Sequence, residues 1–110
     1  MEARLASGIW VSAYLARLRL AGIAAYQVAR GDDTAGAVLV KLSLMDGKAR
    51  LFERQFDLAT DVRVWGVLAE GPEAEIDAIV ARARARDRDL WVIEVEDRLG
   101  RSLLDEAGLA

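Results

Sequence analysis

The stretch Asp87-Arg88-Asp89-Leu90-Trp91-Val92-Ile93-Glu94-Val95-Glu96-Asp97 decides how this chain folds. Its middle alternates and is rich in β-branched residues, which predicts a β-strand. One face would carry the apolar residues Trp91, Ile93 and Val95. The other face would change from apolar to acidic along the strand: Leu90, Val92, Glu94 and Glu96. We therefore expect a central strand whose acidic end emerges at the rim of a sheet.

Hydrophobic periodicity predicts the elements that precede this strand. The expected helices span residues 7–21 and 72–86, with Ser7 as the cap of the first and Pro72 at the first position of the second. The expected strands span residues 24–30, 37–45, 49–56 and 62–68, and a short docking helix would span residues 101–109. The pattern predicts an α+β fold: a single compact domain over residues 1–110, with a mostly antiparallel sheet of about five strands and two main helices.

The dipeptide Asp46-Gly47 predicts a two-residue type I′ hairpin turn. That turn would pair Leu42 with Leu51 and Val40 with Glu53. Opposed residues of an antiparallel pair share a face, so one face would then gather basic and aromatic side chains. Those expected on this face are Tyr26, Arg30, Lys41, Arg50, Phe52 and Arg54.

Composition excludes several kinds of chemistry. The chain has 110 residues, a net charge of −3, no cysteine and no histidine. Disulfides, thiolate zinc sites, a cysteine nucleophile and a histidine base are therefore absent. The acidic balance argues against nucleic acid as a partner, and no apolar run is long enough for a membrane span. We predict no catalytic residue, no metal ligand and no cofactor, and a cytoplasmic location.

Five carboxylates crowd the opening stretch and form a candidate acidic rim: Asp87, Asp89, Glu94, Glu96 and Asp97. Glu94 and Glu96 would point to the same side of the strand, about 6–7 Å apart. Oxygen ligands of this kind suit Mg²⁺ or Mn²⁺, which would indicate an enzyme acting on a phosphate ester or anhydride. A solvated strand face is the interpretation that we favour.

Four basic residues form a candidate anion-binding set: Arg30, Lys41, Arg50 and Arg54. Basic residues among aromatics on a sheet can hold single-stranded RNA, so RNA binding is a weaker alternative. The loop of residues 30–36 contains two glycines, and its backbone donors are a second place where an anion could bind. A partly covered sheet face and an ordinary turn are the structural explanations of the two features.

Three segments together resemble a known bacterial family. They are Arg4-Leu5 with Ile9-Trp10-Val11-Ser12-Ala13, Arg30-Gly31-Asp32 with Ala35-Gly36-Ala37, and Asp87-Arg88-Asp89-Leu90-Trp91-Val92-Ile93-Glu94 with Glu96-Asp97-Arg98. They are similar to the alphaproteobacterial family called domain of unknown function 1491. The third segment is the most specific, although Arg88 stands where the family reads proline. The resemblance implies one compact cytoplasmic domain and supplies no catalytic residue.

The sequence assigns no biochemical activity. Apolar content on both expected sheet faces and three tryptophans predict a non-enzymatic binding or assembly module. We expect it to act as a homodimer or with a protein partner. The metal-dependent enzyme is the alternative, and RNA binding is the weaker one.

Overall fold

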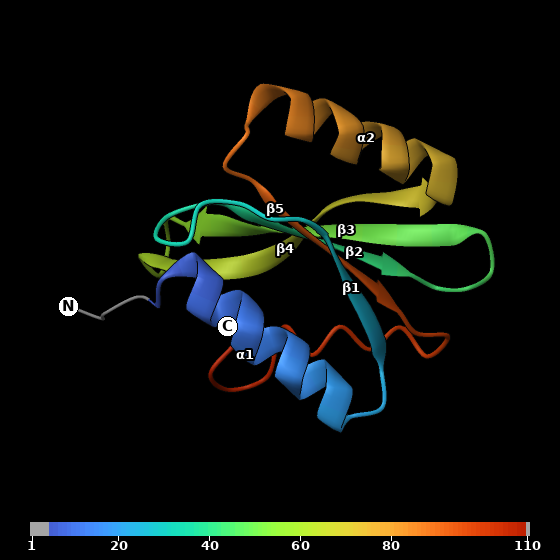
Figure 1. Ribbon diagram of the computed structural model, residues 1–110, viewed down its shortest axis with the longest axis horizontal. Helices are drawn as coiled ribbons and strands as arrows, with labels where there is room; N and C mark the ends of the chain where they lie inside the picture. The colour runs from blue at the N-terminus through green and yellow to red at the C-terminus, as the bar shows by residue number, and fades with distance from the viewer. Residues whose placement is uncertain (1–4, 110) are drawn as a thin grey trace.

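A mixed five-stranded sheet forms the middle layer of the molecule (Figure 1). The computed structural model describes residues 5–109, apart from the side chain of Phe56. Helix α1 (Ser7–Leu20) packs on one face of the sheet and helix α2 (Glu73–Arg86) on the other. The segment after the last strand runs along the α1 side (Figure 1).

The five strands lie in the order β1-β5-β2-β3-β4. They are β1 (Ala24–Ala29), β2 (Val38–Ser43), β3 (Lys48–Asp57), β4 (Val62–Pro72) and β5 (Trp91–Glu96). Three of the four pairings are antiparallel, and β2 runs parallel to β5. The expected fold is thereby confirmed: α+β, with two helices and a mostly antiparallel five-stranded sheet in one compact domain.

Strand β5 is an inner strand, with β1 on one side and β2 on the other. Trp91, Ile93 and Val95 are buried toward α1, while Val92 is buried toward α2. The alternation in the sequence therefore predicted both the strand and its two faces.

The predicted hairpin register was wrong by one residue. Val40 lies opposite Phe52 and Leu42 opposite Arg50. The reason is that Leu44 pairs with Lys48, which leaves three residues in the turn, Met45-Asp46-Gly47. Met45 and Gly47 both have positive φ angles, 64° and 89°. The Ser43 hydroxyl accepts a bond from the Met45 amide, and the Asp46 carboxylate accepts one from the Lys48 amide.

This register separates the predicted basic face into two. Lys41 lies opposite Leu51, which packs under α2. Arg50 lies opposite Leu42, which packs under α1. The longer loop moves every β3 side chain to the other face relative to the prediction, since side chains alternate along a strand.

Both helix starts differ from the prediction. Ala6 is the N-cap of α1, and Ser7 is its first residue, whose hydroxyl donates to the Gly36 carbonyl at 2.6 Å. Pro72 is the N-cap of α2, one position before the helix. Ser7 thus ties the start of α1 to the loop before β2.

The segment after β5 docks on the fold without forming the helix expected over residues 101–109. Its turns cross α1, and its Leu104 and Leu109 side chains are buried. The Tyr14 hydroxyl donates to the Ser102 carbonyl at 2.8 Å, and the Trp10 indole donates to the Leu109 carbonyl at 3.2 Å. Long-range hydrogen bonds, which no local pattern signals, hold this segment in place.

Candidate functional site

The five carboxylates of the predicted acidic rim do not converge on one point. Asp87 and Asp89 lie in the exposed turn before β5, where the Asp87 carboxylate accepts a bond from the Asp89 amide at 2.9 Å. Glu94 faces Lys41, while Glu96 accepts a hydrogen bond from Tyr26, which raises the pKa of that phenol. Within residues 5–109, no group of three or more acidic side chains is placed to hold a metal ion.

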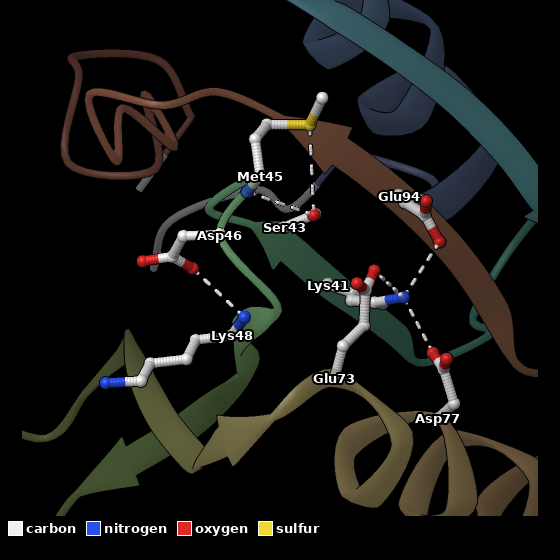
Figure 2. A network of polar contacts seen from close by, with 8 residues as sticks. All are labelled: Lys41, Ser43, Met45, Asp46, Lys48, Glu73, Asp77 and Glu94. Carbon is white, nitrogen blue, oxygen red and sulfur yellow. Dashed lines mark hydrogen bonds and ion pairs between the residues drawn. The ribbon is translucent and has the colours of Figure 1, made fainter.

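The most concentrated charge in the described structure surrounds Lys41 (Figure 2). Its ammonium Nζ lies 2.9 Å from Glu73 Oε1, 2.7 Å from Asp77 Oδ1 and 3.2 Å from Glu94 Oε1. Lys41 itself is buried on β2, with 6% of its side chain exposed. Glu73 and Asp77 come from the first two turns of α2, and Glu94 comes from β5.

The Lys41 cluster stabilises a charged ammonium. Burial lowers the pKa of Lys41, but hydrogen bonds to Asp77 and Glu73 and the charge of Glu94 outweigh burial and raise it above the ordinary value. A lysine held as an ammonium cannot act as a nucleophile or form a Schiff base, since both require the neutral amine. What the cluster does is fasten the start of α2 to two strands of the sheet.

Asp97 supports the segment after β5. This buried carboxylate accepts a bond from the Arg101 amide at 2.7 Å and two more from its guanidinium, both at 2.9 Å. The Arg101 side chain lowers the pKa of Asp97 through these bonds. Arg101 lies in the turn that follows β5, so Asp97 acts as a cap of that turn.

The four predicted anion-binding residues lie apart and have partners within the chain. Arg30 pairs with Asp33 at 3.1 Å, and Arg50 pairs with Glu70 at 3.3 Å. Lys41 is held by three carboxylates on the α2 side of the sheet. Arg54 stacks over two tryptophans on the α1 side, 5.5 Å from the Trp10 ring and 5.2 Å from the Trp65 ring.

The loop of residues 30–36 docks on the start of β5. The Asp32 carboxylate accepts bonds from the Thr34 and Ala35 amides, and the Asp32 amide donates to the Asp89 carbonyl. The Trp91 indole donates to the Asp32 carbonyl at 2.8 Å. Four backbone amides of this loop, those of Asp32, Thr34, Ala35 and Gly36, are thus engaged within the chain. A cavity of about 530 Å³ lies beside this loop, between α1 and β1.

The sequence predicted strand β4 but not its position at the edge of the sheet or its full length. The strand forms an edge of the sheet and is 11 residues long, four residues longer than predicted. Four of its large apolar side chains are 40–49% exposed: Val62, Val64, Val67 and Leu68. The β3–β4 pairing continues past the last residue that β2 pairs, Phe52, as far as Asp57 and Val62. The far half of this hairpin is therefore a two-stranded extension of the sheet.

Among the described residues, no helix is both long and apolar enough to cross a membrane. The family model for a protein of unknown function, DUF1491, matches residues 5–105. No curated protein matches the chain.

Solved structures of this family are similar over nearly the whole chain. The crystal structure of a DUF1491 family protein from Caulobacter crescentus is 40% identical, with a TM-score of 0.81 over 93% of this chain and 94% of that one. The solution structure of a protein from A. tumefaciens is 32% identical, with a TM-score of 0.71 over 86% of each chain. The match over residues 5–105 and these likenesses show that the chain belongs to the DUF1491 family.

Proposed function

We propose that this protein is a small, non-enzymatic assembly module of the cytoplasm that acts as a homodimer. The observation that carries the proposal is the apolar edge strand β4, with four large apolar side chains 40–49% exposed. An edge strand presents backbone donors and acceptors that have no strand partner in its own sheet. Large exposed apolar side chains on both faces of such an edge strand favour an interaction along the edge.

The charged residues support a structural role more than a catalytic one. Lys41 is held as an ammonium by three carboxylates, and Asp97 closes a turn with Arg101. Neither the geometry nor the relatives support a metal-dependent enzyme acting on phosphate compounds. RNA binding is also not favoured, because Lys41 lies on the opposite face of the sheet from Arg50 and Arg54.

The test is the mass of the protein in solution. Size-exclusion chromatography with light scattering at micromolar concentrations should give about twice the chain mass of 12.0 kDa. The mass should fall on dilution, with a continuous shift from dimer to monomer. A mass that stays near 12.0 kDa up to high micromolar concentrations would contradict the proposal.

A further inference from the structure

We infer that the partner of strand β4 is β4 of a second copy, paired antiparallel about a two-fold axis at Gly66. This inference rests on the proposed homodimer and adds its surface and its register. In this register Arg63 of one copy lies opposite Glu70 of the other. The two sheets then join into one continuous sheet, and each β4 edge covers the other.

The β-bulge in β4 fixes which side chains can share a face. Arg63, Trp65 and Val67 lie opposite Phe56, Arg54 and Phe52 of β3. The register shifts between Leu51 and Phe52 of β3, which leaves Leu68 of β4 as the extra residue. Past the bulge, Glu70 lies opposite Arg50 and returns to the same α1 face.

With Leu68 as the extra residue on each strand, a two-fold register centred on Gly66 matches every face. Opposed residues must point to the same side of the joined sheet, and this register satisfies that condition throughout. Its pairs are Arg63 with Glu70, Val64 with Ala69, Trp65 with Val67 and Gly66 with Gly66.

Charge and the types of the paired residues both favour a second copy in this register. A two-fold axis repeats each contact, so the dimer gains two Arg63–Glu70 pairs and two Trp65–Val67 pairs. Opposite charges and aromatic residues beside β-branched ones are stabilising cross-strand pairs. Glu70 is 65% exposed at its side chain, which leaves room for a second cation beside its ion pair with Arg50.

The chain allows a direct test of the register, because it has no cysteine. The variant with both Val64→Cys and Ala69→Cys should form a covalent dimer in a glutathione redox buffer. Opposed residues of an antiparallel pair have Cα atoms roughly 4.5–5.5 Å apart, which suits a disulfide. Within one strand, the two positions are roughly 16 Å apart, too far for an internal bond.

Each single-cysteine variant is the matched control for this disulfide cross-linking experiment. In this register a thiol introduced by Val64→Cys is separated along the strands from the same thiol of the other copy. The same holds for Ala69→Cys, so neither variant alone should be trapped. Mixing the two single variants should restore the covalent dimer. Trapping of a single variant as strongly as the double variant would overturn the register.

A charge swap provides a test that needs no cysteine. Arg63→Glu and Glu70→Arg should each raise the dimer dissociation constant about tenfold, since each places two like-charged pairs across the axis. Combining both changes should restore most of the affinity. Arg82→Glu on the exposed face of α2 is the control, with a dissociation constant within about twofold of the wild type.

The outcomes separate the register from the dimer itself. Dimers that are neither trapped by the double cysteine variant nor weakened by the charge changes would overturn the β4 register and leave the homodimer in place. A wild-type protein that is monomeric throughout would overturn both. Circular dichroism of each variant shows whether a loss of dimer reflects a loss of fold.

Discussion

Lys41 is a buried lysine whose ammonium group is surrounded by three carboxylates. A buried ammonium is costly unless carboxylates surround it, and here one ammonium is shared by Glu73, Asp77 and Glu94. The three acids come from α2 and β5, which are far from Lys41 in the chain. Their convergence depends on the parallel pairing of β2 with β5, which places Lys41 opposite Glu94, and on the packing of α2 over that face of the sheet.

Removal of this cation should destabilise the fold. We expect Lys41→Met to lower the free energy of unfolding by about 1–3 kcal/mol, because three carboxylates would lose their shared partner. Urea unfolding at neutral pH measures the change, and Lys48→Met at an exposed position is the control. Adding Glu94→Gln to Lys41→Met should recover part of the loss. Equal stability of Lys41→Met and the wild type would contradict the structural role of the cluster.

The pH dependence of Lys41 has a defined sign. Its pKa in the fold is raised above the ordinary lysine value of 10.5, so the folded state binds the proton more tightly than the unfolded chain. The stabilisation is therefore complete at neutral pH and is lost only as pH rises past that value. The difference between Lys41→Met and the wild type should be constant between pH 6 and 9 and should shrink in stronger alkali.

The stabilisation by Asp97 depends on pH in the opposite direction, because it is lost in acid and not in alkali. Its pKa in the fold lies below the ordinary value of 3.8, so its contribution is present above that value and is lost as pH falls through the lowered pKa. Asp97→Asn should lower the free energy of unfolding by about 1–2 kcal/mol at pH 7 and by less at pH 3. Urea unfolding at both values tests this, with the exposed Asp105→Asn as control. A loss that is the same at pH 3 and pH 7 would refute the ionic explanation.

At the scale of elements, local sequence signals predicted most helices and strands, but they did not predict the contacts between distant segments. The alternation of β5, the period of α1 and the Gly71-Pro72 start of α2 gave the elements within a few residues. The Asp46-Gly47 signal placed the hairpin but not its register. The register depends on a positive φ at Met45, a conformation that methionine rarely adopts and that its sequence position does not indicate. The carboxylates of the predicted acidic rim do not converge, because Glu94 and Glu96 have partners on other strands while Asp87 and Asp97 close local turns.

The loop of residues 30–36 and the start of β5 form one packed unit. A Cβ on Gly31 would collide with the Asp89 carbonyl and with Trp91. Gly31→Ala should therefore lower the free energy of unfolding by more than about 2 kcal/mol, since backbone cannot move aside. Thr34→Ala in the same loop is exposed and should change stability by less than about 0.5 kcal/mol. Thermal unfolding of the two variants tests the contact, and similar melting temperatures would argue against it.

At the scale of the whole molecule, the two edges of the sheet differ. Strand β1 has six residues and two large hydrophobic side chains that are exposed, Tyr26 and Val28, whereas β4 has 11 residues and four such side chains. The sequence indicated an assembly module from its apolar content, but it could not say which strands form the edges of the sheet. That choice follows from the strand order, which is set by the parallel pairing of β2 with β5.

Hydrogen exchange tests the central claim, self-association through β4, most directly. Peptides that cover β4 should exchange more slowly at high than at low protein concentration, because pairing with a second copy protects its outward amides. Peptides that cover β1, the opposite edge, should exchange at the same rate at both concentrations. Exchange in β4 that does not depend on concentration, or protection that appears at β1 instead, would contradict the account.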